Sequence, residues 1–129
     1  MQNLITLPCH VDARGSLTVV EKKIPFNIQR VFWIAGMPQG AVRGGHGHIR
    51  THMALVCLTG GCTVEVKRLD ESHKVLKTLH FTLDTPQSLL YLPPYDWHQM
   101  YDFMPGTVLL ALASEHHDLE DYIHKVNES

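Results

Sequence analysis

The sequence predicts an all-β protein, folded as a β-sandwich or a small barrel. Apolar and polar residues mostly alternate with a period of two, as around Val64 and Val66, whose neighbours along the chain are polar. Segments rich in β-branched, aromatic or leucine residues recur along the chain, and turn-forming residues separate them. Short strands with a turn every ~8–12 residues are typical of sandwiches and barrels. We expect a single domain over residues 1–129.

The expected strands follow one another along most of the chain. Each of these segments combines strand-favouring residues with a turn signal at its ends: residues 16–20, 28–35, 51–58, 63–67, 75–83, 88–92, 97–103 and 107–114. Gly60-Gly61 predicts a hairpin turn, because glycine tolerates the positive φ that such turns require. Pro93-Pro94 also breaks the pattern.

Only the C-terminal tail has a helical pattern. Between His117 and Val126, apolar residues recur at the i, i+3, i+4, i+7 spacing of an amphipathic helix, at Leu119, Tyr122, Ile123 and Val126. We therefore expect a short C-terminal helix after the strands.

The overall charge and hydropathy narrow the classes of partner. The chain has 11 Lys+Arg against 13 Asp+Glu, a net charge of −2, which gives no support for nucleic-acid binding. The longest apolar run near the end, Val108–Ala113, is far shorter than the about 20 residues that span a bilayer. The N-terminus lacks the basic start and long apolar stretch of a secretory signal. We expect a cytoplasmic protein with neither a nucleic-acid nor a membrane partner.

Histidine is the residue type that points to chemistry. Of ten histidines, His46, His48 and His52 fall within seven residues. In an extended chain alternate side chains share a face, so His46 and His48 point the same way, and His52 joins them if no bulge intervenes. His98 opens a later strand and is expected to converge with them. Such a group of imidazoles suits either proton transfer or metal binding.

Three glycines surround the first two histidines, at Gly44, Gly45 and Gly47. Glycine leaves the backbone bare, and we interpret this stretch as one that allows a ligand to approach closely.

Several segments, taken together and in order, carry a resemblance to a known family. The matching segments are Asp12–Leu17, Ile24–Val31, Arg43–His48, Leu55–Gly60, Trp97–Met100, Leu110–Ser114 and Asp121–Ile123. In these the chain resembles the nucleotide-sugar 3,4-ketoisomerases, cupin enzymes that act on dTDP-4-keto-6-deoxyglucose. The sequence departs from that family's usual pattern at Phe32-Trp33, where tyrosines are common, at Ile49, where lysine is common, and at Met53, where glutamine is common.

The resemblance implies a cupin jelly-roll fold and a homodimer whose N-terminal strands are exchanged between subunits. It also implies a reaction that moves a keto group from C4 to C3 of a dTDP-linked deoxysugar, without a metal or an organic cofactor, in deoxysugar biosynthesis of the kind that serves lipopolysaccharide O-antigens. The configuration at C4 of the product and the identity of the nucleotide stay open.

Candidate site residues follow from the histidine pattern and the matching segments. His46 and His48 are the candidate acid and base, with the order between them unassigned. Arg43 is a candidate for stabilising oxyanion charge or holding a diphosphate oxygen. The remaining substrate-binding candidates are Arg14, Arg30, His52, Tyr95, Trp97 and His98.

Two other functions stay open at this point. A metal-dependent cupin, such as a dioxygenase or a sugar-phosphate isomerase, could use His46, His48, His52 and His98 as a four-nitrogen site. A non-catalytic module that binds a sugar nucleotide is the third possibility.

Overall fold

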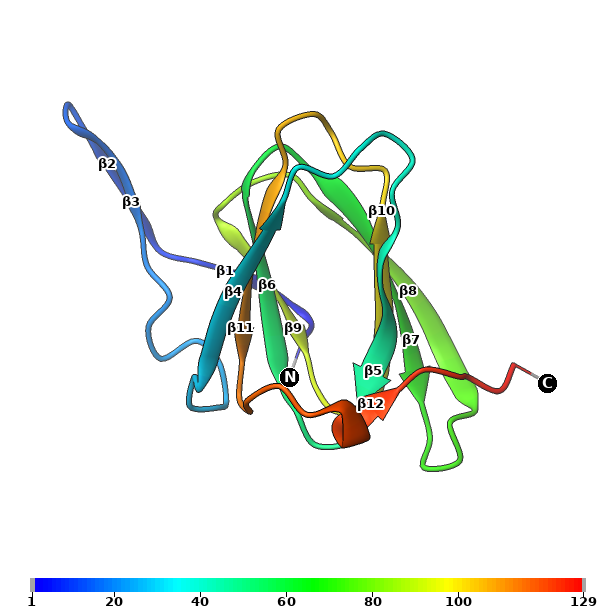
Figure 1. Ribbon diagram of the computed structural model, residues 1–129. Helices are drawn as coiled ribbons and strands as arrows, with labels where there is room; N and C mark the ends of the chain where they lie inside the picture. The colour runs from blue at the N-terminus through cyan, green and yellow to red at the C-terminus, as the bar shows by residue number, and fades with distance from the viewer. Residues whose placement is uncertain (1, 129) are drawn as a thin grey trace.

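The chain folds into two five-stranded antiparallel sheets and one separate β-hairpin (Figure 1). The structure is a computed structural model and describes residues 2–128. Its strands are β1 (Leu4–Thr6), β2 (Cys9–Asp12), β3 (Gly15–Thr18), β4 (Arg30–Ala35), β5 (Arg43–His48), β6 (Met53–Thr59), β7 (Cys62–Leu69), β8 (Val75–Leu83), β9 (Ser88–Leu92), β10 (Asp96–Tyr101), β11 (Val108–Ala113) and β12 (Tyr122–Ile123). A 3₁₀ turn, η1 (Leu119–Asp121), precedes β12.

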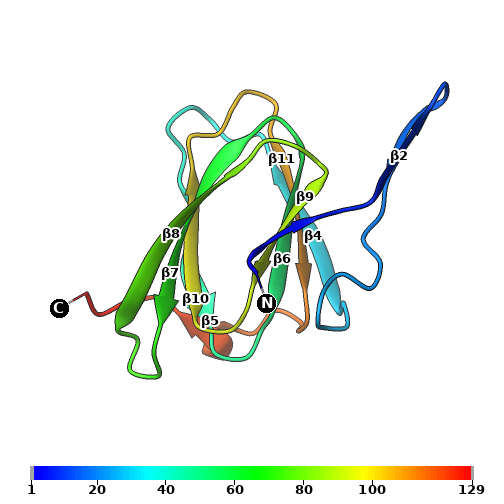
Figure 2. The ribbon, with the colours of Figure 1, turned by 180° about the vertical axis from the view of Figure 1, so that it is seen from behind.

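The two sheets face each other and form a sandwich. One sheet has the order β1-β9-β6-β11-β4 and the other has the order β12-β5-β10-β7-β8. The view from behind shows the same two layers, with the N-terminal hairpin standing clear of both (Figure 2). The predicted all-β fold is therefore confirmed.

The main core lies between the sheets and is built by the predicted alternation. In β7, Cys62, Val64 and Val66 are buried, whereas the residues between them are half-exposed. Strand β6 is an exception, because its residues 53–57 are all buried. One face of β6 joins the main core, and the other joins a second apolar cluster on the outside of its sheet, which also holds residues such as Val20 and Phe26. A continuous apolar run is what a strand covered on both faces requires.

All eight predicted strand segments overlap observed strands. Four strands lie outside these segments: β5, which falls in the stretch treated as extended around His46 and His48, and β1, β2 and β12, which the sequence does not indicate. These three strands are only two to four residues long, so they hold too few positions for a period of two to stand out. Their place is fixed by pairing instead, since β1 pairs with β9 and β12 pairs with β5.

The expected C-terminal helix is wrong. The tail forms only the 3₁₀ turn η1 and then the short strand β12. The four apolar residues do not share one buried face, because Leu119 is 71% exposed while Ile123 is 1% exposed. Tyr122 pairs with His48, and Ile123 pairs with Gly47. This pairing keeps the backbone extended, although the spacing of the apolar residues predicts a helix.

The expected hairpin at Gly60-Gly61 is also wrong, although the turn itself is present. Strands β6 and β7 lie in different sheets, so the two glycines carry the chain across the end of the sandwich. Gly60 has a φ of +81°, and a Cβ there would lie 2.6 Å from the Cα of Thr107. No helix of the described residues is long and apolar enough to cross a membrane.

We expect Gly60→Ala to destabilise the protein more than Gly106→Ala. Both glycines have a positive φ, so both substitutions carry the strain of a left-handed L-residue. Only at Gly60 does the new methyl group meet backbone, and forcing atoms into such a space typically costs ~1–3 kcal/mol more. Urea unfolding of the two variants measures the difference, and equal losses would contradict the proposed corner packing.

Candidate active site

A cavity of about 250 Å³ lies between the sheets, and His46 and His48 line it. It is bounded by strands β4, β5 and β12 and by the segment that leads from β11 into η1. The residues that line it are Arg30, Phe32, Ile34, Arg43, His46, His48, Thr51, Met53, Ala113, Glu115, His116, His117, Asp118 and Tyr122.

The two central histidines share this cavity. His46 and His48 are two positions apart on β5, and their ring centroids are 5.3 Å apart at an interplanar angle of 86°. His46 pairs with His98 of β10, and His48 pairs with Tyr122 of β12. The prediction that His46 and His48 point the same way is confirmed.

The glycine between these histidines serves strand packing. A Cβ on Gly47 would lie 3.0 Å from the Cα of Trp97 and 3.2 Å from its backbone nitrogen. Side-chain atoms at this position would therefore push β5 away from the neighbouring strand. The interpretation of Gly47 as room for a ligand is therefore wrong, because this glycine allows close contact between two backbones.

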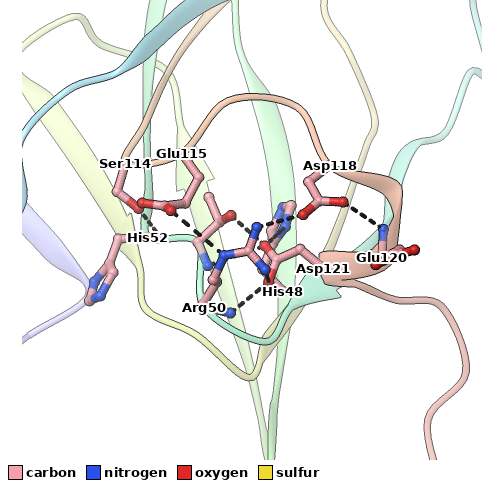
Figure 3. A network of polar contacts seen from close by, with 9 residues as sticks. His48, Arg50, His52, Ser114, Glu115, Asp118, Glu120 and Asp121 are labelled. Carbon is pink, nitrogen blue, oxygen red and sulfur yellow. Dashed lines mark hydrogen bonds and ion pairs between the residues drawn. The ribbon is translucent and has the colours of Figure 1, made fainter.

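A buried carboxylate holds His48. The side chain of Asp121 is 1% exposed, and its Oδ2 lies 3.0 Å from Nδ1 of His48 (Figure 3). The same carboxylate accepts hydrogen bonds from the backbone N–H of Arg50 at 2.8 Å, from the backbone N–H of Thr51 at 3.2 Å, and from the Thr51 hydroxyl. An ionised carboxylate only accepts, so Nδ1 of His48 carries the hydrogen and Nε2 presents a lone pair.

The surroundings of Asp121 and His48 favour an ionised carboxylate and a neutral imidazole, which are the forms that their hydrogen bond requires. Burial alone would raise the pKa of Asp121, but hydrogen bonds from Thr51, Arg50 and His48 outweigh it and hold the pKa below its ordinary 3.8. Burial also lowers the pKa of His48, although Asp121 works in the opposite direction. His48 Nε2 is buried and has no hydrogen-bond partner among the described residues. A neutral imidazole with a free lone pair is suited to accept a proton.

His46 has a different environment. Burial, followed by the charge of His48, lowers its pKa to about 4, and the backbone of Gly44 opposes this shift. Its ring lies between the ring of Tyr122, with centroids 4.6 Å apart, and the ring of His98, with centroids 5.1 Å apart. His46 is therefore a neutral imidazole at neutral pH.

His98 lies behind His46 and not on the wall of the main cavity. It is 2% exposed and borders a smaller apolar space of about 70 Å³ that adjoins the main cavity. Burial, with the charges of His46 and His48, lowers its pKa to about 3. The expected convergence of His46, His48 and His98 is confirmed, and His98 contacts the ring of His46.

The cavity also has a cationic and an aromatic wall. Arg30 and Arg43 both line it, and the Arg30 guanidinium lies 4.3 Å from the centroid of the Phe32 ring. Phe32 faces the cavity, whereas Trp33 points outward and is 66% exposed. The inward member of this pair is thus a ring without a hydroxyl.

His52 does not join the histidine cluster. The chain turns after β5, and the His52 ring instead lies 2.7 Å from the Tyr91 hydroxyl through Nδ1 and 5.8 Å from the Phe26 ring, on the outside of the first sheet. Figure 3 shows it pointing away from His48. The four-histidine set of the metal-dependent alternative is therefore not assembled. Among residues 2–128, no group of three or more His, Cys, Asp or Glu side chains is arranged to hold a metal ion.

Three further candidates lie away from the cavity. Arg14 is at the tip of the β2–β3 hairpin, where it pairs with Asp12 at 2.6 Å. Tyr95 and Trp97 belong to a small apolar cluster with Leu69 and Ile123, outside the main core. The Trp97 indole donates to the backbone carbonyl of His124.

The sequence interpretation missed Asp121, Tyr122 and His117. All three come from the tail that was expected to be helical, and 73 residues separate Asp121 from His48. The segment Asp121–Ile123 resembles the family pattern, and it is the signal in the sequence that points to Asp121 and Tyr122.

Comparison with known proteins gives consistent matches along nearly the whole chain. A family model described as "FdtA: WxcM-like, C-terminal" matches residues 1–128. The chain is 40% identical over 117 residues to TDP-4-oxo-6-deoxy-alpha-D-glucose-3,4-oxoisomerase of Aneurinibacillus thermoaerophilus, which covers 89% of this chain and 80% of the relative.

Solved structures match as well. A mutant of the 3,4-ketoisomerase QdtA from Thermoanaerobacterium thermosaccharolyticum, in complex with TDP-4-keto-6-deoxyglucose, superposes with a TM-score of 0.85 at 36% identity, over 95% of this chain and 86% of that one. The rmlC epimerase of Mycobacterium tuberculosis superposes with a TM-score of 0.78 at 16% identity, over 92% of this chain and 66% of that one. The second likeness shows a shared sandwich fold.

Folding stability should fall as the pH drops below 6.5. The folded-state pKa values of His46 and His98, about 4 and about 3, lie below the ordinary 6.5. Between these values and 6.5 the unfolded chain binds protons that the folded chain does not, so stability rises with pH in this window and is lost as the pH falls through it.

Urea unfolding at a series of pH values from ~8 to ~5 measures this dependence. His98→Gln should flatten it, because one non-titrating side chain replaces the buried imidazole. His80→Gln, at an exposed position on β8, is the matched control and should leave the dependence unchanged. An identical pH dependence in His98→Gln and the unmodified protein would contradict the account.

Proposed function

This chain belongs to the FdtA/WxcM-like family of TDP-sugar 3,4-ketoisomerases, enzymes with the cupin fold, and we propose that it isomerises TDP-4-keto-6-deoxyglucose through His46 and His48. The observation that carries the proposal is that these two imidazoles share one cavity in different environments, one hydrogen-bonded to a carboxylate and one held neutral among aromatic rings.

His48 is the base that acts on carbon. The C4 carbonyl of the substrate acidifies the neighbouring C3–H, and a base is needed to remove that proton. His48 Nε2 has a free lone pair, and Asp121 stabilises the imidazolium that forms when the proton arrives. The same imidazolium then returns a proton to C4.

His46 moves the proton between the two oxygens. A neutral imidazole has one N–H donor and one acceptor nitrogen, and its pKa of about 4 keeps His46 in this form. The N–H donates to O4 as the enediol forms, and the same nitrogen takes up the proton of O3 as the C3 carbonyl forms. A neutral histidine that polarises a carbonyl in this way is a known solution in a different isomerase.

The two transfers balance without an external oxidant or reductant. The C3–H bond breaks and a C4–H bond forms through His48, while the O3–H bond breaks and an O4–H bond forms through His46. The carbonyl moves from C4 to C3, and both histidines end in their starting forms. Arg30 and Arg43 line the same cavity and supply positive charge for the diphosphate or for the developing oxyanion.

We expect His48→Asn and His46→Asn to fail in different ways when the reaction is followed by NMR in deuterated water. The unmodified protein should move the carbonyl and incorporate deuterium. His48→Asn should lose both by ~10²–10⁴-fold, because no base reaches C3. His46→Asn should slow carbonyl migration by ~10²-fold or more, because the proton is no longer transferred from O3 to O4. Deuterium should still enter C3, because His48 removes the C3 proton without His46.

His80→Asn is the matched control and should react like the unmodified protein, since this histidine lies on β8, does not line the cavity, and forms a hydrogen bond with Glu65. A folded, unmodified protein that leaves the spectrum of TDP-4-keto-6-deoxyglucose unchanged would refute the activity. Equal loss of exchange and migration in both variants would refute the division of labour.

The assembly we infer is a homodimer in which the N-terminal hairpin lies on a second copy. The β2–β3 hairpin projects from the sandwich (Figures 1 and 2), and Val11 and Leu17 on it are 74% and 59% exposed. An isolated two-stranded hairpin is at best marginally stable in water, so a partner surface is needed to hold it. Strand β4 is the edge of its sheet and presents Val31 and Trp33 outward. Arg14 does not line the cavity of its own chain, so its predicted role in substrate binding relies on such an assembly.

Sedimentation equilibrium should report two chains per particle. Replacing both Val11 and Leu17 by Asp should produce a folded monomer, because the charges would be buried in the contact between copies. Leu76→Asp, a comparably exposed position on β8, is the matched control and should stay dimeric. An unmodified protein that sediments as a monomer would contradict the inference.

A further inference from the structure

The two catalytic imidazoles are held in different ways. His48 is fixed by a hydrogen bond to Asp121. Among the described residues, no side chain makes a hydrogen bond to the His46 ring, and its neighbours are rings: Tyr122, His98 and His48. Beside a backbone hydrogen bond at Gly44, the orientation of the His46 ring therefore depends on packing against these rings.

Tyr122 makes the one face-to-face contact in this group. Its ring centroid lies 4.6 Å from that of His46 at an interplanar angle of 17°, whereas His98 and His48 meet His46 at 66° and 86°. The pairing of Tyr122 with His48 across β12 and β5 places the tyrosine on the cavity side of the sheet, beside both histidines. A stacked ring restricts tilting of the imidazole plane, which edge contacts alone do not.

The chain around Tyr122 is anchored on both sides. The preceding residue, Asp121, is buried and accepts hydrogen bonds from His48, Arg50 and Thr51. The following residue, Ile123, is 1% exposed and packs against Trp97. Tyr122 is thus presented from a fixed stretch of backbone.

We propose that Tyr122 is a positioning residue for His46: its ring holds the imidazole plane so that one ring nitrogen faces O3 and O4 of the sugar. This inference rests on the proposed function, because it assigns a purpose to the orientation of His46. The aromatic face carries the role, so the hydroxyl group is dispensable. Misplacement of a reacting group by ~1 Å can cost ~10²-fold in rate, and the loss of the stack is expected to act through this effect.

Three variants test the proposal in deuterated water, with carbonyl migration and deuterium entry at C3 followed separately. Tyr122→Phe keeps the stacked ring and should migrate the carbonyl within ~2-fold of the unmodified rate. Tyr122→Leu removes the ring and should slow migration by ~10-fold or more, with KM and C3 exchange nearly unchanged, because His48 and Asp121 stay in place. Leu119→Ala, in the same turn but exposed, is the control and should change neither rate.

Three outcomes would overturn the proposal. Loss of as much activity in Tyr122→Phe as in Tyr122→Leu would show that the hydroxyl, and not the aromatic ring, carries the role. Equal loss of exchange and migration in Tyr122→Leu would show a general disturbance of the site. A migration rate in Tyr122→Leu equal to that of the unmodified protein would show that Tyr122 does not position His46. Should the leucine variant fail to melt cooperatively, Tyr122→Val, which suits a strand, takes its place. An unmodified protein without exchange or migration would instead refute the proposed function itself.

Discussion

The buried carboxylate of Asp121 is the constraint on which the rest of the site depends. It satisfies two backbone N–H groups in the turn after β5, the hydroxyl of Thr51 and the Nδ1–H of His48. A charge that is 1% exposed is tolerated only when such partners replace water. The same contacts bind the C-terminal tail to β5. The Asp121 carboxylate therefore fixes both the path of the chain after β5 and the orientation of the His48 ring. Arg50 adds a bridge from this turn to Asp118, with Glu115 nearby at 3.6 Å (Figure 3).

Three histidines of the same cluster acquire different properties because their surroundings differ. His48 contacts a carboxylate, which favours the imidazolium and so supports a proton acceptor. His46 contacts mainly rings, and burial keeps it neutral. His98 is buried behind both, where a charge would be most costly. The proposed reaction, which moves one proton between carbons and another between oxygens, uses this difference between His48 and His46.

The fold was largely predictable from local pattern, and the site only in part. Alternation identified strands such as β7, and the period of two placed His46 and His48 on one face, because both features depend on residues close in sequence. The tail was misread because its spacing fits a helix, whereas Asp121 and Tyr122 are fixed by contacts with residues about 70 positions earlier. His52 departed from the cluster because the Asp121 contacts turn the chain after His48. No local pattern records such long-range contacts.

The tautomer of His48 tests the central claim most directly. In protein labelled with ¹⁵N-histidine, NMR at neutral pH distinguishes a protonated ring nitrogen from one with a free lone pair. The account predicts a protonated Nδ1 and an unprotonated Nε2 on His48, with Asp121→Asn removing this preference. A His48 ring protonated on Nε2 alone, or unaffected by Asp121→Asn, would contradict it.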